Sequence, residues 1–184
     1  MYYEVFIAGA GGQGVLLMGN IISYYAMLND LNTTFMPSYG VEMRGGMTHC
    51  TVIISDEEIG SPVLQEVDNV VIMSPFASQF TTMVKNGGIL ILNSSLVKSH
   101  QCEKENVTIL KQPFNDLALK AGNSKITNMI ALGYLWGVTK PLPFDEKLLQ
   151  QAMLGILGES KKKFIPSNIE AFIEGYQLGE REKI

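Results

Sequence analysis

The chain has 184 residues, of which 46% are hydrophobic and 17% charged, as in a folded protein with a continuous core. Its formal net charge of -4 argues against nucleic-acid binding, because phosphates need a basic surface and the only basic run is Lys161-Lys162-Lys163. Its two cysteines cannot supply the four thiolates of an iron–sulfur cluster, and no apolar run approaches the roughly 20 residues that span a bilayer. We therefore expect a cytoplasmic protein, not inserted in a membrane and without a signal peptide.

Short β-branched runs alternate with helical patterns over the first 110 residues. Strands are predicted over residues 3–8, 33–36, 50–55, 70–74, 89–92 and 107–110. Apolar residues at helical spacing predict a helix over 15–28, and a second over 76–85 is expected to end at Asn86-Gly87-Gly88.

After Leu110 the pattern is mostly helical. Helices are predicted over residues 115–121, 127–137, 145–157 and 167–179, with a break at Thr139-Lys140-Pro141-Leu142-Pro143. Strands that alternate with helices predict a three-layer α/β fold, with a mostly parallel Rossmann-like sheet, helices on both faces and a helical C-terminal part.

The first predicted strand leads into a glycine-rich turn, Gly9-Ala10-Gly11-Gly12-Gln13-Gly14. Its glycines match G-x-G-x-x-G, a spacing in which amides at the start of a helix face an anion. An NAD-binding fold would also carry an acidic residue after the second strand, but Met36-Pro37-Ser38 stand there. The turn therefore predicts either a phosphate-bearing cofactor at residues 9 and 11–14 or close packing of a helix on a strand.

A second glycine-rich turn follows the second predicted strand: Tyr39-Gly40-Val41-Glu42-Met43-Arg44-Gly45-Gly46. Since both turns follow strands of a parallel sheet, we expect them at the same edge. Arginine has a planar fork that suits carboxylates and phosphates, so Arg44 is the candidate catalytic residue, supported by Glu42. Tyr39, Gly40, Gly45 and Gly46 are expected to border a cofactor. A surface ion pair between Glu42 and Arg44 is the alternative.

No metal site is expected. His49 and His100 lack carboxylate or cysteine partners at metal-binding spacing, so both are interpreted as structural. The sequence also contains no nucleophile elbow and no P-loop, so it does not predict a catalyst that acts alone.

Three segments carry a resemblance to a known family: residues 9–14, 37–46 and 55–62. Together they resemble the gamma subunit of 2-oxoacid:ferredoxin oxidoreductases, and residues 125–133 and 168–175 resemble two helices of the same family. The resemblance covers nearly the whole chain, so residues 1–184 are expected to form a single gamma-type domain. Gamma subunits of the pyruvate type tend to have Arg-Gly-Ala, whereas Arg44-Gly45-Gly46 is closer to the 2-oxoglutarate and branched-chain types.

The resemblance implies a complex that decarboxylates a 2-oxoacid, such as 2-oxoglutarate, on thiamine diphosphate with Mg²⁺. Electrons would pass through iron–sulfur clusters to ferredoxin or another acceptor, and succinyl-CoA would be released. The partners would be alpha, beta and ferredoxin-like delta subunits, and this chain would hold no cofactor alone. Its own role would be to complete the active-site wall and help to receive coenzyme A. The alternatives are a subunit of a branched-chain 2-oxoisovalerate or indolepyruvate oxidoreductase, or a stand-alone nucleotide-binding regulator.

Overall fold

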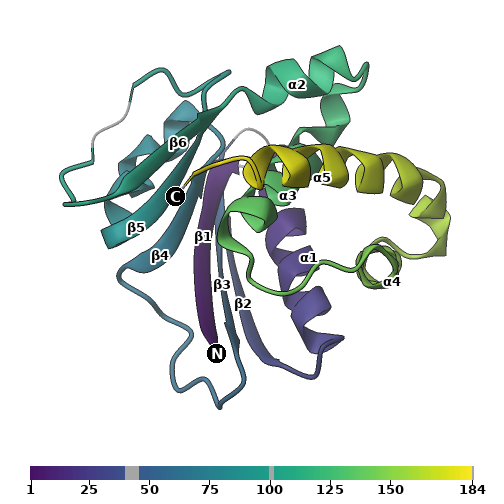
Figure 1. Ribbon diagram of the computed structural model, residues 1–184, viewed down its shortest axis with the longest axis horizontal. Coiled ribbons are helices and arrows are strands. Elements are labelled where there is room, and N and C mark those ends of the chain that lie inside the picture. Colours follow the sequence, from purple (N-terminus) through teal and green to yellow (C-terminus); the bar gives the residue numbers. More distant parts are fainter. Residues whose placement is uncertain (40–45, 100–101, 184) are drawn as a thin grey trace.

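The computed structural model describes residues 1–39, 46–99 and 102–183. Within these ranges a six-stranded sheet has the order β2-β3-β1-β4-β5-β6 (Figure 1). Strands β1, β4, β5 and β6 are parallel, whereas β3 is antiparallel to both of its neighbours, β1 and β2. The strands are β1 (Tyr2–Ala10), β2 (Asn32–Tyr39), β3 (Met47–Ser55), β4 (Val67–Ile72), β5 (Val84–Asn93) and β6 (Thr108–Gln112).

The longer helices lie on one side of the sheet (Figure 1). They are α1 (Val15–Met27), α3 (Thr127–Thr139), α4 (Glu146–Leu157) and α5 (Ile165–Gly179), and the short α2 (Phe114–Lys120) follows β6 and contacts α3. The other face carries a 3-10 helix, η1 (Pro75–Met83), against β1, β4 and β5. Two further 3-10 helices precede α3 and α5: η2 (Ser124–Ile126) and η3 (Glu159–Phe164). The predicted α/β fold with a helical C-terminal part is confirmed.

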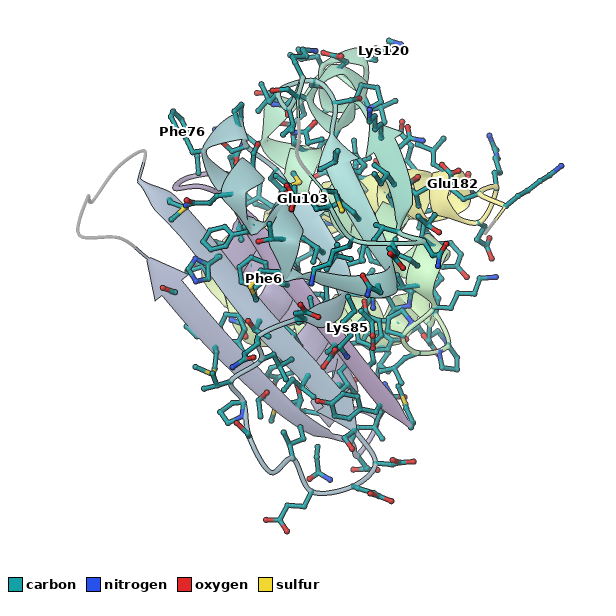
Figure 2. The ribbon with its side chains drawn as sticks, turned by 90° about the vertical axis from the view of Figure 1, so that its left-hand side faces the viewer. Phe6, Phe76, Lys85, Glu103, Lys120 and Glu182 are labelled. Carbon is teal, nitrogen blue, oxygen red and sulfur yellow. The ribbon has the colours of Figure 1, made fainter. Side chains whose placement is uncertain are left out.

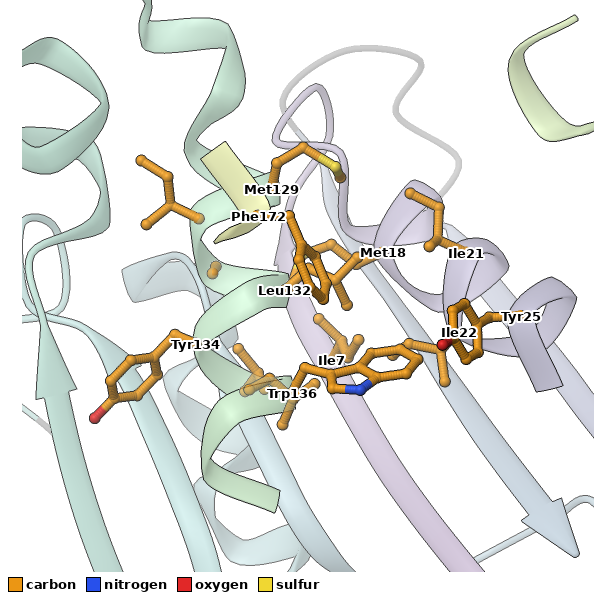
Figure 3. Packing of buried hydrophobic residues seen from close by; sticks show 14 of the residues in the cluster. Ile7, Met18, Ile21, Ile22, Tyr25, Met129, Leu132, Tyr134, Trp136 and Phe172 are labelled. Atoms are coloured by element: carbon orange, nitrogen blue, oxygen red, sulfur yellow. The ribbon is translucent and has the colours of Figure 1, made fainter. Parts of the chain in front are cut away.

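The larger apolar cluster fills the space between the sheet and the helices. Figure 3 shows the Trp136 side chain of α3 over β1, with its ring pointing toward Tyr25 of α1. The two rings meet edge to face with centroids 4.8 Å apart. The Trp136 indole N–H donates to the Leu142 carbonyl at 3.0 Å, and the Tyr25 hydroxyl donates to the Pro143 carbonyl at 2.8 Å. These bonds hold the predicted break between α3 and α4 against the core.

The opposite face of the sheet, seen in Figure 2, carries a smaller cluster around Phe6 of β1. Its ring lies 5.1 Å from the rings of His49 and Phe80, measured between centroids. Burial lowers the pKa of His49. Farther along β1 on this face, the buried Glu4 carboxylate pairs with Lys85. The described part of the chain therefore has an aromatic setting for His49, while His100 lies outside it.

Several predicted boundaries differ from the structure, and two differences have a clear physical reason. Strand β2 runs through Pro37 to Tyr39, which is tolerated because β2 is an outer strand with one unpaired edge. The predicted helix over residues 76–85 is instead the 3-10 helix η1, and residues 86–88 lie within β5 rather than in a helix cap. There the pairing with β4 shifts, and Gly87 has a φ of 75°. The prediction of a cap was wrong because a glycine in the left-handed conformation serves a strand irregularity equally well.

Helices α3 and α5 approach each other so closely that their backbones touch. A Cβ atom added at Gly133 would overlap the Phe172 carbonyl, and one added at Gly175 would overlap the Ile130 carbonyl. Each helix has a second glycine four residues later, on the same side, with a similar backbone neighbour: Gly137 in α3 and Gly179 in α5. We call these four residues the helix-pair glycines.

Candidate functional site

The first glycine-rich turn lies at the same edge of the sheet as the two described ends of the second, Tyr39 and Gly46. Strand β2 is parallel to β1 because the antiparallel β3 lies between them. Ala10 at the end of β1 is paired with Met47 at the start of β3, and the Gly11 N–H donates to the Gly46 carbonyl at 2.7 Å. The first turn therefore contacts the last residue of the second.

Most of the second turn lies outside the described residues. Gly40, Glu42, Arg44 and Gly45 belong to that part, whereas the backbone of Tyr39 ends β2 opposite Thr48. The arrangement of the strands gives a physical reason against an NAD site. On this side β1 is flanked by the antiparallel β3, so no parallel neighbour brings an acidic residue to the turn.

The side chain of Gln13 closes the first turn. Its Oε1 accepts a hydrogen bond from the Ala10 N–H at 2.7 Å, and its Nε2 donates to the Met73 carbonyl at 3.2 Å. A Cβ atom at Gly9 would lie 2.6 Å from Gln13 Oε1, so glycine leaves room for this side chain. Gln13 thereby bridges the ends of β1 and β4. These strands mark the switch point of the sheet, because β2 and β3 lie on one side of β1 and β4, β5 and β6 lie on the other.

The backbone amides of this turn divide into two groups. The Gly11 N–H donates to Gly46, and the Gln13 N–H donates to the Ala10 carbonyl at 3.1 Å, so both are used within the protein. Gly14 is the N-cap of α1, and no side chain caps that helix. No described residue accepts a hydrogen bond from the N–H groups of Gly12 or Gly14. The amides that can face a ligand therefore include those of Gly12 and Gly14.

A cleft of about 500 Å³ opens beside the turn. We call it the turn cleft; its borders include Gly12, Gln13 and Gly14 on one side and Asn115, Lys125 and Asn128 on the other. Asn115 lies in the first turn of α2 and Asn128 in the first turn of α3, so the starts of three helices meet here. Helix starts carry positive partial charge, which favours negatively charged or hydrogen-bond-accepting ligands.

Asn128 fits against the backbone of Gly14. The residue is only 7% exposed, and its Nδ2 lies 3.5 Å from the Gly14 carbonyl, at the limit of a hydrogen bond. A Cβ atom at Gly14 would lie 2.8 Å from Asn128 Cγ, and Gly14 has a φ of 74°. Glycine is thus needed at 14 for both its conformation and its lack of a side chain.

Asn93 and Asn115 form a hydrogen-bonded pair that the sequence pattern did not predict. Asn93, the last residue of β5, is completely buried. Its Nδ2 donates to the Met73 carbonyl at 3.1 Å and to Asn115 Oδ1 at 2.7 Å. Among the described residues, Asn93 Oδ1 has no donor. The available signal was an asparagine that directly follows the apolar run Ile89-Leu90-Ile91-Leu92.

A second cleft, of about 540 Å³, adjoins the turn cleft. The two share Leu17, Lys125 and Asn128, and the second extends to Lys161 and Phe164 of η3. Two exposed lysines therefore border a continuous depression that begins at the start of α1.

The described residues offer little redox or metal chemistry. Cys50 is buried behind α1, where its thiol donates to the Val15 carbonyl at 3.6 Å and burial raises its pKa to about 12. No group of three or more His, Cys, Asp or Glu residues in the described ranges could hold a metal ion. In the same ranges, no helix has the length and apolar character to cross a membrane.

Known proteins resemble this chain over nearly its whole length. Residues 4–178 match the sequence model of a family described as pyruvate ferredoxin/flavodoxin oxidoreductase. The 2-oxoglutarate synthase subunit KorC of Methanocaldococcus jannaschii is 30% identical over 181 residues, which cover 97% of this chain and 94% of that protein.

Two further relatives differ in how much of them the chain covers. The ketoisovalerate oxidoreductase subunit VorA of Methanothermobacter marburgensis is 32% identical over 175 residues, which are 94% of this chain but only 35% of VorA. The crystal structure of the gamma subunit of keto/oxoacid ferredoxin oxidoreductase from Geobacter sulfurreducens PCA is 26% identical, with a TM-score of 0.79. That match covers 98% of this chain and 99% of the gamma subunit.

Proposed function

This chain belongs to the pyruvate ferredoxin/flavodoxin oxidoreductase family, and we propose that it is the gamma subunit of a 2-oxoacid:ferredoxin oxidoreductase. The family match agrees with the resemblance predicted from residues 9–14, 37–46 and 55–62. The proposed reaction is oxidative decarboxylation of 2-oxoglutarate to succinyl-CoA. The observation that carries this choice is the match to KorC, which extends over nearly the full length of both chains.

The proposed contribution of this subunit is to receive coenzyme A in the turn cleft and its neighbour. Coenzyme A carries several phosphate groups, and Lys125 and Lys161 border the two clefts. The N–H groups of Gly12 and Gly14, at the start of α1, lie beside the same depression. Backbone amides at a helix start and nearby lysines are a favourable setting for phosphate.

The remaining chemistry is assigned to partner subunits. Alpha, beta and ferredoxin-like delta subunits would hold thiamine diphosphate, Mg²⁺ and the iron–sulfur clusters, and would pass electrons to ferredoxin or another acceptor. Cys50 and Cys102 of this chain are too few to ligate a cluster. We place the complex in the cytoplasm and treat residues 1–184 as a single domain of it.

Purification of the native complex through a tag on this chain tests the proposal. Partner subunits should co-purify, and 2-oxoglutarate should reduce an acceptor dye in a reaction that requires coenzyme A. Faster reduction with 2-oxoisovalerate or indolepyruvate would overturn the choice of substrate. A chain that purifies without partners and binds a nucleotide tightly would instead support the stand-alone regulator.

The second glycine-rich turn supplies the other proposed contacts. Arg44, with Glu42 in support, is proposed to bind a substrate carboxylate, a coenzyme phosphate or a partner carboxylate through a charge-assisted hydrogen bond. Tyr39, Gly40, Gly45 and Gly46 are proposed to let ligand or partner approach the backbone, because three of them lack a side chain.

The Arg44 proposal can be tested with three variants of the complex. Arg44→Ala should raise the KM for 2-oxoglutarate or coenzyme A, or weaken subunit association, and Arg44→Lys should restore only part of the loss because it lacks the bidentate fork. Arg181→Ala removes the other arginine of the chain and serves as the control. Unchanged KM values and stoichiometry in Arg44→Ala would remove this role.

A further inference from the structure

We propose that the turn cleft recognises an amide group of its ligand, through the side-chain N–H₂ of Asn115 and the side-chain oxygen of Asn128. The inference rests on the proposed function in taking coenzyme A as the ligand, and it adds the chemistry by which the uncharged part of that ligand is held. Three side-chain amides border the cleft, those of Gln13, Asn115 and Asn128, and the inference follows from which end of each is already hydrogen-bonded within the protein.

Asn115 presents a donor. A side-chain amide has one oxygen, which accepts, and one N–H₂, which donates. The oxygen of Asn115 accepts the 2.7 Å hydrogen bond from Asn93, which fixes the orientation of the Asn115 amide. Asn93 is completely buried and also donates to the Met73 carbonyl, so it acts as the positioning residue. The end of Asn115 that remains for the cleft is its N–H₂.

Asn128 presents an acceptor. Its Nδ2 is directed at the Gly14 carbonyl, and no described residue donates to its Oδ1. The residue is more than nine-tenths buried, and it borders both the turn cleft and the adjoining cleft. Asn128 Oδ1 is not among the buried, unpartnered side-chain atoms of the described residues, so it is open to the depression and can accept a hydrogen bond from a ligand there.

Gln13 borders the same cleft but has no free end. Its oxygen accepts from Ala10 and its nitrogen donates to Met73. Of these three side-chain amides, the ends without a hydrogen-bond partner in the described part of the chain are thus the N–H₂ of Asn115 and the oxygen of Asn128. A phosphate or carboxylate would leave the acceptor unsatisfied, whereas an amide supplies both a carbonyl for the donor and an N–H for the acceptor.

The adjoining lysines indicate what is attached to that amide. Lys125 borders both clefts and Lys161 borders only the second, so together they favour an anionic group where the turn cleft meets its neighbour. A ligand with an amide-containing chain joined to phosphates satisfies both regions. The pantetheine arm of coenzyme A contains two amides between its thiol and its phosphates, so it matches this order. A peptide segment of a partner subunit is the other source of an amide.

Two fragments of the ligand separate the two regions. Pantetheine is uncharged and carries the amides, whereas adenosine 3′,5′-bisphosphate carries phosphates and no amide. Their dissociation constants would be measured by ligand-observed NMR on the full chain. Asn128→Ala should weaken pantetheine at least tenfold and leave the bisphosphate unchanged. Lys125→Gln should weaken the bisphosphate and leave pantetheine unchanged.

Asn115→Asp gives the sharpest single test. Aspartate keeps an oxygen for the hydrogen bond from Asn93 but replaces the donor with a second acceptor, so pantetheine should again bind at least tenfold more weakly. Asn86→Asp is the matched control, because Asn86 Oδ1 accepts from the Glu105 N–H far from the cleft and aspartate preserves that bond. If Asn115→Asp or Asn128→Ala fails to fold, the other of these two variants still tests recognition of the amide.

Equal pantetheine binding by the wild type, Asn115→Asp and Asn128→Ala would overturn the inference. So would a wild-type chain that binds no pantetheine while Asn115→Asp prevents subunit assembly, because the amide would then belong to a partner peptide. Pantetheine binding needs neither partner subunits nor turnover. A complex without 2-oxoacid activity would therefore contradict the proposed function alone. A complex with normal activity, in which Asn115→Asp and Asn128→Ala leave the dissociation constant of pantetheine unchanged, would contradict the amide site alone.

Discussion

Glycines make room for different neighbours at two places in this molecule. The helix-pair glycines, such as Gly133 and Gly175, admit the backbone of the facing helix. Gly9 near the end of β1 and Gly14 in the turn that follows instead leave room for polar side chains, those of Gln13 and Asn128. At the helix pair two backbones close against each other, whereas at the turn the admitted side chains border an open cleft.

Glycine spacing alone therefore does not separate helix packing from ligand binding. G-x-x-x-G in α3 and α5 marks a contact between helices, and G-x-G-x-x-G at the end of β1 borders the turn cleft, yet both permit close approach. What separates them is the neighbour. A carbonyl that contacts a facing helix leaves no space for a ligand, whereas Asn128 retains an unused acceptor beside a cleft.

The largest effect is expected at the helix pair. Gly133→Ala should lower the free energy of unfolding by about 3 kcal/mol, because its Cβ would overlap backbone that can yield only if the helices separate. Chemical denaturation measures this loss. Gly60→Ala is the control, since a Cβ there meets nothing within 4 Å. Equal stability of the two variants would show that the helices are not held this closely.

A smaller loss, about 2 kcal/mol, is expected for Gly14→Ala, which combines the strain of a positive φ with displacement of a side chain. The displaced group is Asn128, so a double-mutant cycle with Asn128→Ala should show a coupling of about 1 kcal/mol. Additive effects would mean that Gly14 and Asn128 do not compete for space. Coenzyme A binding should weaken in Gly14→Ala even where the protein remains folded.

The smallest effect should come from Gly12→Ala. Gly12 has a φ of 92°, but a Cβ there meets nothing within 4 Å, so about 1 kcal/mol of backbone strain is the whole expected loss. Its denaturation midpoint should therefore lie between those of the wild type and Gly14→Ala. A loss as large as that of Gly133→Ala would contradict the assignment of open space beside Gly12.

Local pattern was sufficient to predict much of the fold. Apolar spacing predicted α1 and all four C-terminal helices, because each has a buried face and an end marked by proline, glycine or a polar cap. The antiparallel direction of β3 did not follow from the alternation of strands and helices. It depends on the short connection from Tyr39 to Met47, which returns the chain directly alongside β2.

The candidate site was predictable only where its contacts are local. Gln13 was identified with its turn, and its bond to Ala10 spans three residues. Asn93 and Asn115 were missed because their bonds join β5 to the ends of other elements, 20 and 22 residues away. The helix-pair glycines were missed for the same reason, since each contacts a helix distant in sequence.

Hydrogen exchange of the native complex, with and without coenzyme A, tests whether this subunit receives coenzyme A in the two clefts. We expect slower exchange with coenzyme A over residues 12–17 and 124–130, which border the two clefts, and unchanged exchange over residues 169–179 of α5. Unchanged exchange at both cleft segments under conditions where coenzyme A is bound would contradict the claim that this subunit receives it there.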